Sequence, residues 1–133
     1  MTINLPGHER CFACRPESEG GPGLKFEPGP DGVMRARWTA GSDYQSYDGV
    51  LHGGIIALLL DAAMTHCLLA QGVQCLTARL SIRYLERVPI GAELDIEAGV
   101  KDKRMGLHIV EALLKRDDRV VAKAEGRLMP YGG

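Results

Sequence analysis

The sequence predicts an α+β domain in which a curved antiparallel sheet wraps one long helix. One long apolar segment, residues 53–70, has the length of a helix, and strand-like segments stand before and after it. The turns between these segments are short and rich in Gly, Pro and Asp. A helix that is apolar on nearly every side must be covered on more than one side, so a sheet of about five to six strands curved around it is the economical arrangement.

The chain has 133 residues, which suits one compact domain over residues 1–133. Its apolar content of 45% and its charged content of 25% are ordinary for a globular protein. A formal net charge of -1 gives no reason to expect nucleic acid or an anionic membrane surface as a partner. The partner therefore has to be inferred from a local site.

Residues 1–23 are expected to form an irregular lead-in, because they are rich in Pro, Gly and charge and show no sustained period. Pro6, His8, Glu9 and Arg10 stand where a secretory signal would need a cationic start and a continuous apolar stretch. We therefore expect a cytoplasmic protein whose cysteines are reduced.

Two short strands are expected before the helix, at residues 24–27 and 33–39. Between them, the segment from Pro28 to Gly32 has the Gly, Pro and Asp content of a hairpin connection. A loop over residues 40–51 then leads into the helix.

The helix is expected to begin at Gly53 and to end at Ala70, because Gly72 stands where a left-handed residue usually terminates a helix. At 1.5 Å per residue it is about 27 Å long. Residues 55–70 are apolar enough to suggest a membrane span, but Asp61 near the centre would cost roughly 2.5 to 3.5 kcal/mol in a bilayer. A helix buried in protein fits better, and no membrane partner is expected.

Four strands are expected after the helix, at residues 77–84, 93–100, 105–115 and 120–129. The first two alternate apolar and polar residues with a period of two, so each has one face toward a core. The charged residues 101–104 are expected to form the turn between the second and third of these strands. Asp117 and Asp118 suit a tight hairpin between the third and fourth.

The helix start has the properties of an oxyanion site. The first backbone N–H groups of a helix have no partner within the helix and carry the positive end of its dipole. Gly53 and Gly54 would let a ligand carbonyl approach this backbone closely, and His52 before them could cap the helix or position the loop. The alternative is that the two glycines only permit tight packing of the helix start.

Asp61 follows Gly54 by seven residues, so both lie on one face of the helix but are separated along it by roughly 10 Å. One carbonyl group cannot touch both. If they act on the same bond, an antiparallel helix from a second copy of the chain must complete the site, which predicts a dimer with two equivalent sites. A partly buried carboxylate suits a general base or a nucleophile. The alternative is a structural carboxylate with a local hydrogen bond, for instance to Thr65.

His52-Gly53-Gly54 followed by Asp61 resembles the HGG...D signature of hotdog-fold thioesterases, and most closely the PaaI-like, phenylacetate-pathway type of acyl-CoA thioesterase. The resemblance extends over about residues 11–129. It includes the Cys-Phe-x-Cys lead-in at residues 11–14 and the strand expected after the helix.

The resemblance implies a set of roles. Gly54 N–H would polarise the thioester carbonyl, and Asp61 of the facing subunit would activate water or attack the carbonyl. Thr77 would orient the water, and His52 would support the loop. Relatives often carry an Asn six residues before the motif histidine, where this chain has Ser46. The substrate-binding residues would be Ser46, Tyr47, Gly53 and Arg83, the last near the CoA nucleotide.

The four cysteines are unevenly spaced, so we expect thiols or metal ligands rather than a disulfide framework. His8, Cys11 and Cys14 could supply three zinc ligands, but no fourth ligand lies nearby in the sequence. Packed thiols fit better, and neither a metal nor an organic cofactor is expected.

The sequence therefore favours an acyl-CoA thioesterase that works as a homodimer, possibly a dimer of dimers. One alternative is a hotdog protein that binds an acyl thioester or an aromatic ligand without hydrolysing it. Another is a zinc-stabilised interaction protein built on the Cys11 and Cys14 lead-in. The acyl group that is accepted depends on how the helix packs against the facing subunit.

Overall fold

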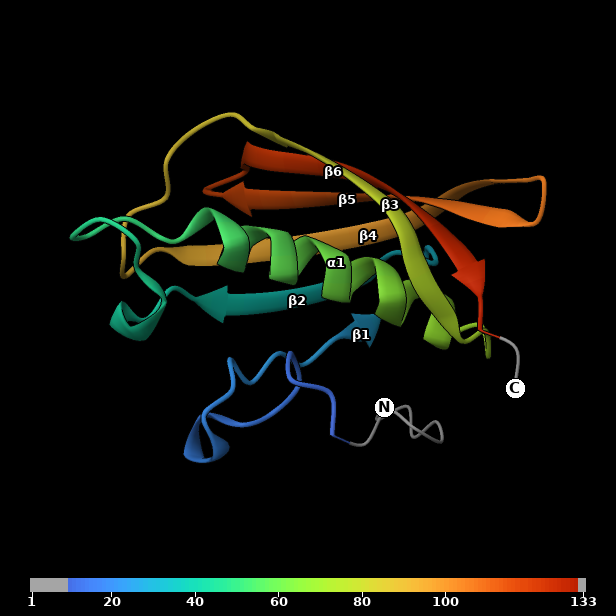
Figure 1. Ribbon diagram of the computed structural model, residues 1–133. Helices are drawn as coiled ribbons and strands as arrows, with labels where there is room; N and C mark the ends of the chain where they lie inside the picture. The colour runs from blue at the N-terminus through green and yellow to red at the C-terminus, as the bar shows by residue number, and fades with distance from the viewer. Residues whose placement is uncertain (1–9, 132–133) are drawn as a thin grey trace.

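The computed structural model describes residues 10–131, and the structural statements below refer to this part of the chain. One helix, α1 (Gly53–Leu69), is accompanied by two short 3-10 helices at Glu17–Glu19 and Ser42–Tyr44. The strands are β1 (Glu27–Pro28), β2 (Met34–Thr39), β3 (Cys75–Tyr84), β4 (Glu93–Arg104), β5 (Leu107–Arg116) and β6 (Arg119–Pro130) (Figure 1). The expected α+β architecture is confirmed.

All six strands form one antiparallel sheet in the order β1-β2-β4-β5-β6-β3. The expectation that hairpin-sized turns join all the strands is wrong for β3 and β4, because β5 and β6 lie between these two strands. The connection over residues 85–92 instead runs back past the helix start. There the fully buried Val88 accepts a hydrogen bond from Leu51 N–H at 2.8 Å.

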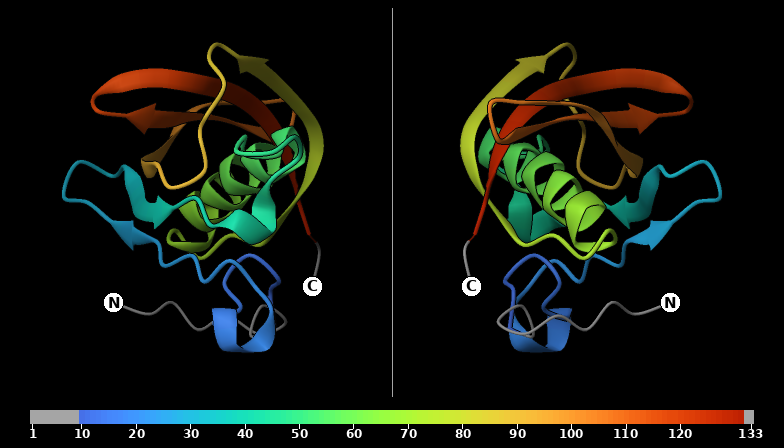
Figure 2. Two further views of the ribbon diagram at one scale, coloured as in Figure 1. Left: turned by 90° about the vertical axis from the view of Figure 1, so that its left-hand side faces the viewer. Right: turned by 90° about the vertical axis from the view of Figure 1, so that its right-hand side faces the viewer.

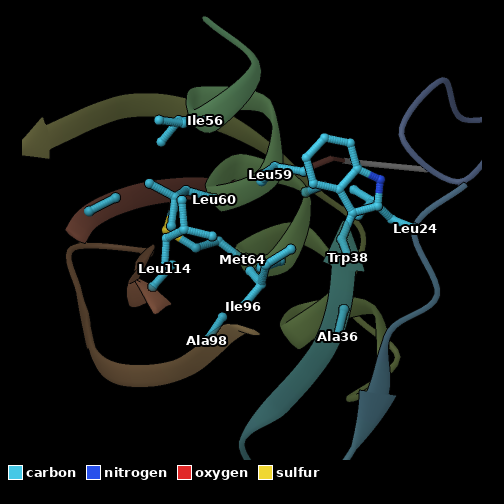
Figure 3. Packing of buried hydrophobic residues seen from close by; sticks show 14 of the residues in the cluster. Leu24, Ala36, Trp38, Ile56, Leu59, Leu60, Met64, Ile96, Ala98 and Leu114 are labelled. Atoms are coloured by element: carbon cyan, nitrogen blue, oxygen red, sulfur yellow. The ribbon is translucent and has the colours of Figure 1, made fainter. Parts of the chain in front are cut away.

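The sheet curves around α1, as expected. Figure 2 shows β2 and β3 on opposite flanks of the helix and β4 to β6 arching over it. The helix contacts every strand from β2 to β6 and buries most of its circumference. Leu59 and Met64 of α1 pack with Trp38 of β2 and Ile96 of β4 in the core (Figure 3). Burial of this kind contributes roughly 1.5 to 3 kcal/mol per large apolar side chain.

The predicted lead-in packs on the side of α1 that the sheet leaves open (Figure 2). Its described residues are irregular apart from Glu17–Glu19, yet Ala13 is only 2% exposed and Trp38 Nε1 donates to Pro22 O at 2.8 Å. The expected strand at 24–27 is largely wrong. Leu24 N–H donates to Ala13 O at 3.0 Å instead of to a neighbouring strand, and β1 has only two residues.

The two hairpins after β4 differ in how well the sequence predicted them. Asp117 and Asp118 have positive φ angles of 52° and 64° and form the expected tight turn. The turn expected at 101–104 is wrong, because β4 continues to Arg104 and the chain reverses at Met105. Lys101 stays in the sheet at a bulge, where its Nζ lies 2.9 Å from Glu111 and 3.5 Å from Glu125.

The helix ends as predicted. Gly72 has a φ of +77°, and its N–H donates to Leu69 O at 2.9 Å. No helix within residues 10–131 is long and apolar enough to cross a membrane.

Candidate active site

His52 caps the start of α1. Its Nδ1 accepts a hydrogen bond from Gly54 N–H at 2.8 Å, which satisfies one of the free amides of the first turn. Tyr84 of β3, which was not among the predicted site residues, donates from its hydroxyl to Gly53 O at 2.9 Å. The helix start is thus held from the loop before it and from the edge strand beside it.

A small hollow of about 200 Å³ opens at this helix start. It is lined by Asp43, Tyr44, Gln45, His52, Gly54 and Ile55. Larger hollows, of about 460 and 530 Å³, lie elsewhere on the sheet, and charged residues make up half or more of the lining of each. The hollow beside Gly54 is the one at the positive end of the helix dipole, so it is the better place for a carbonyl group.

None of the four predicted substrate-binding residues, Ser46, Tyr47, Gly53 and Arg83, belongs to the lining of this hollow. Ser46 is exposed, and its backbone N–H donates to Val50 O at 2.9 Å. Tyr47 is 84% exposed. The neighbouring Gln45, which the sequence did not single out, does line the hollow, and its Oε1 accepts from Gly49 N–H at 3.1 Å.

Asp61 is half-buried and accepts a hydrogen bond from the Thr77 hydroxyl at 2.6 Å. The side chain that donates a hydrogen bond to Asp61 therefore comes from β3, and not from Thr65 of the same helix. The structure brings together two of the predicted catalytic residues that lie sixteen positions apart in the sequence. A short hydrogen bond to a carboxylate fixes its orientation, as a base or a nucleophile requires.

A bulge in β3 makes this contact possible. The register of β3 against β6 shifts between Thr77 and Arg79. Leu80 and Ile82 pack toward the core, and strict alternation would put Thr77 on the opposite, outer face with Arg79. The bulge adds one residue, Ala78, and so turns Thr77 toward α1.

Gly54 and Asp61 lie on the least covered stripe of the helix. Gly54, Leu58, Asp61 and Thr65 follow one another at helical spacing, and none of them is buried. The rise of the helix separates Gly54 from Asp61 by roughly 10 Å, so one protomer does not bring both to a single carbonyl. The stripe faces the flank where β3 forms the open edge of the sheet.

The open edge strand β3 and the residue after it carry exposed apolar side chains. Leu76 is 54% exposed, Tyr84 51% and Leu85 47%. An unpaired edge with apolar side chains is the kind of surface that pairs with another chain.

Arg83 lies apart from the other predicted site residues of the same protomer. It stands on the outer face of β3, directly opposite Lys123 of β6. Neither cation forms an ion pair with the described residues, although like charges placed across strands destabilise a sheet. The pair lines the edge of a hollow on the outer face.

The described residues provide no set of ligands for the zinc site that was considered at His8, Cys11 and Cys14. His8 lies outside the described residues, and residues 10–131 contain no group of three or more His, Cys, Asp or Glu side chains that could hold a metal ion.

The chain belongs to the thioesterase superfamily, since a family model of that description matches residues 48–123, which is more than half of the chain. The match begins in the loop before Gly53 and continues through α1 into β6. The helix and its curved sheet are the hotdog fold of this superfamily.

Individual relatives agree with this assignment. MIOREX complex component 3 of Saccharomyces cerevisiae is 29% identical over 105 residues, which make up 77% of this chain and 39% of the yeast protein. A crystal structure of a thioesterase superfamily protein is 28% identical with a TM-score of 0.77, and the match covers 84% of this chain and 55% of that one. The chain thus spans only part of the length of both relatives.

A hypothetical thioesterase from Streptococcus pneumoniae shares the fold. Its structure with coenzyme A is 21% identical with a TM-score of 0.76, and the match covers 82% of this chain and 89% of that one. Two further structures of the streptococcal protein carry alanine in place of one threonine and of one aspartate.

Proposed function

We propose that the protein is an acyl-CoA thioesterase that hydrolyses the thioester to a free acid and CoA. The observation that carries the proposal is Asp61, oriented by Thr77 at 2.6 Å on the open stripe of the helix whose first turn lines the hollow at Gly54. The streptococcal relative was solved with coenzyme A, and its two substituted residues are sixteen positions apart, as Asp61 and Thr77 are.

In the proposed reaction, the thioester carbonyl oxygen accepts a hydrogen bond from Gly54 N–H. As the carbonyl carbon becomes tetrahedral, negative charge develops on that oxygen beside the positive end of α1. An oxyanion donor of this kind contributes about 2.7 to 4 kcal/mol to acyl transfer. Asp61 either removes a proton from the attacking water, or attacks the carbonyl itself and forms a mixed anhydride that water hydrolyses after the thiolate has left. The C–S bond then breaks, and the CoA sulfur leaves and takes up a proton.

His52 has to release the amide for this to happen. Gly54 N–H donates to His52 Nδ1 in the free protein, so a substrate carbonyl must replace the imidazole at this donor. When the substrate carbonyl replaces the imidazole, Gly54 N–H still donates one hydrogen bond. Substrate binding then requires only that the exposed His52 side chain rotates away. His52 thereby keeps the helix start satisfied until substrate arrives.

Each site in this proposal needs two subunits. We infer a homodimer in which Asp61 of the partner subunit reaches the carbonyl held at Gly54. The roughly 10 Å between Gly54 and Asp61 of one helix and the open apolar edge at β3 support this arrangement. A dimer of dimers would use further sheet surface.

Substrate binding is assigned to both sides of the helix start. Gly53 and Gly54 admit the thioester, and Ser46 and Tyr47 are proposed to contact it from the loop that leads into the helix. Gln45 lines the hollow and carries the carboxamide chemistry that relatives supply with Asn, so we assign it the hydrogen bond to the thioester. Arg83, with Lys123 opposite, is proposed to bind the phosphates of CoA.

We infer further that the protein belongs to the PaaI-like type and acts in the cytoplasm on a CoA ester. The HGG...D motif supports the type. None of the four cysteines is part of a disulfide, and unpaired cysteines of this kind are typical of proteins in a reducing compartment.

A second candidate function is binding of an acyl thioester without hydrolysis. The contact that favours it is the same His52 cap, because a permanently occupied Gly54 N–H would not polarise a carbonyl. Ser46 in place of the usual Asn points in the same direction.

A panel of short, long and aryl acyl-CoAs, assayed by release of free CoA, separates the two functions and defines the acyl group. We expect turnover of at least one class and a loss of about 10²- to 10⁴-fold in kcat for Asp61→Asn, which removes the base or nucleophile while keeping the shape of the side chain. Binding of acyl-CoA with no CoA release by the unmodified protein would favour the second function. Undiminished turnover by Asp61→Asn would contradict the mechanism.

A further inference from the structure

Cys11 and Cys14 of the lead-in meet His66 of α1. Cys14 Sγ lies 3.0 Å from His66 Nε2, although the residues are 52 positions apart in the sequence. The pKa of Cys14 is raised, first by its interaction with the Cys11 side chain and then by burial. His66 stacks on the ring of Phe26, with the ring centroids 4.7 Å apart, so its imidazole is held in place.

The backbone at the cysteine pair has the geometry that a disulfide needs. Cys14 N–H donates to Cys11 O at 3.2 Å, which closes a four-residue turn. The ends of such a turn lie within about 7 Å of each other, and disulfides join Cα atoms roughly 4.4 to 6.8 Å apart. Neither cysteine is part of a disulfide, and both are partly exposed. The pair is therefore accessible to a reagent.

The pair opens into a surface hollow of about 350 Å³. Its lining is Arg10, Cys11, Cys14, Arg15, Pro16 and Glu19. Two guanidinium groups and one carboxylate give this lining a positive balance. Cations near a thiol favour the reactive thiolate, and they also attract anionic thiol compounds.

The other two cysteines differ in each of these respects. Cys67 and Cys75 are buried, and burial raises the pKa of both thiols. Cys67 Sγ contacts Ala98 O at 3.7 Å within the core. They are packing residues, and they serve as internal controls for the pair on the surface.

We propose that Cys11 and Cys14 form a site of reversible thiol–disulfide exchange with a small anionic disulfide of the oxidised glutathione type, with His66 as the base for the second thiol. The site is separate from Gly54 and Asp61. It is also independent of whether the protein hydrolyses thioesters.

The exchange runs in two balanced steps. The Cys11 thiolate attacks one sulfur of glutathione disulfide, which forms a mixed disulfide and releases one glutathione. The interaction with the Cys11 side chain, together with burial, raises the pKa of Cys14, so Cys14 keeps its proton at this stage. His66 then takes that proton, Cys14 attacks the Cys11 sulfur, and the second glutathione leaves and is protonated. Two protein thiols are oxidised and one disulfide is reduced.

Equilibration of the full-length protein with mixtures of oxidised and reduced glutathione, followed by intact mass and peptide mapping, tests the proposal. The unmodified protein should lose two hydrogens and carry a Cys11 to Cys14 bond that excess reduced glutathione reverses. Cys14→Ser should stop at one glutathione on Cys11, because the second step is blocked. Cys75→Ser is the matched control. This variant should form the disulfide between Cys11 and Cys14 as the unmodified protein does.

His66→Gln tests the base with a readout that a purely structural role would not change. The mixed disulfide should accumulate in this variant, and the rate of its closure should lose the pH dependence that a histidine gives. An unmodified protein that stays reduced while Cys14→Ser is glutathionylated would overturn the proposal. So would one equivalent of zinc released when the thiols are blocked, because the pair would then be a metal ligand set.

Discussion

Asp61 is oriented by a hydroxyl from the strand beside it and not by its own helix. Thr77 donates at 2.6 Å to one carboxylate oxygen of Asp61, which is half-buried on the open stripe of α1. A carboxylate on an apolar helix costs stability unless its hydrogen bonds are satisfied. Thr77 supplies that hydrogen bond and fixes the direction in which the carboxylate can react.

Replacing Thr77 by Ala should lower kcat about tenfold or more without unfolding the protein. Hydrogen bonds to charged groups contribute about 1.5 to 3 kcal/mol, and 1.4 kcal/mol corresponds to a factor of ten in rate. Thr77→Ser keeps the hydroxyl and should stay within about threefold of the unmodified protein. Steady-state kinetics on the best acyl-CoA of the panel measures both. Equal kcat for the Ala variant and the unmodified protein would leave Thr77 without a role.

The two glycines at the helix start, Gly53 and Gly54, should differ in how well they tolerate substitution by alanine. A Cβ on Gly54 would stand 3.0 Å from His52 Nδ1 and Cε1, so the imidazole would have to move. A Cβ on Gly53 would meet the Tyr84 ring at 3.6 Å, an ordinary contact. We expect Gly54→Ala to lower kcat/KM by about 10- to 100-fold, and Gly53→Ala, which adds a side chain without displacing His52, to lower it less. Equal losses in both variants would favour simple packing over an oxyanion site.

At the scale of elements, the lead-in acts as part of the core. Ala13 of the lead-in and Leu24, the residue directly after it, are each 2% exposed, and the segment covers the side of α1 opposite the sheet (Figure 2). The lead-in carries the thiol pair and places it against His66. Its irregular backbone depends on close approach at one glycine, Gly21, which is buried against Arg15.

Gly21→Ala should destabilise the protein by about 1 to 3 kcal/mol, because a Cβ there would collide with the Arg15 carbonyl, which is backbone and cannot rotate away. Gly41→Ala is the matched control. Its Cβ would meet only the Tyr44 ring at 3.8 Å, and its effect should stay within about 0.5 kcal/mol. Urea unfolding measures both. If the two variants unfold at the same urea concentration, the lead-in does not belong to the cooperative core.

Elements with a strong local signal were predictable from the sequence. The helix from Gly53 to Leu69 and its left-handed Gly72 follow from length, apolar content and cap chemistry. The Asp117-Asp118 hairpin follows from turn preferences. In each case neighbouring residues alone decide the conformation, so no knowledge of the fold is needed.

Features that depend on long-range pairing were not predictable. Ala78 and Lys101 sit at bulges, where one extra residue changes which side chains face the core. The sequence around them reads as a regular strand and as a charged turn. The role of Gln45 and the Tyr84 contact with Gly53 also depend on how the loop and β3 meet at the helix start.

At the scale of the whole molecule, the protomer is half of the proposed catalyst. Its sheet has an open edge at β3, and the strand order leaves this edge beside the stripe that carries Gly54 and Asp61. The sequence predicted the need for a second subunit from the helical rise alone. The position of the edge strand could not be predicted, because nothing in the local sequence says that β3 pairs with β6.

Mixing two inactive variants tests the shared site most directly. Asp61→Asn lacks the carboxylate, and Gly54→Val fills the space beside the amide. In a mixed dimer, one site would combine an intact Gly54 with an intact Asp61, and the other site would carry both changes. Random exchange makes half of the dimers mixed, so about a quarter of the unmodified activity should return.

The measurement is the rate of CoA release after the two variants have been unfolded and refolded together, with mixed dimers confirmed by differently tagged subunits. Return of about a quarter of the activity is the result that the shared site predicts. Mixed dimers that form in the expected proportion and remain inactive would contradict it, and would place Gly54 and Asp61 in separate roles.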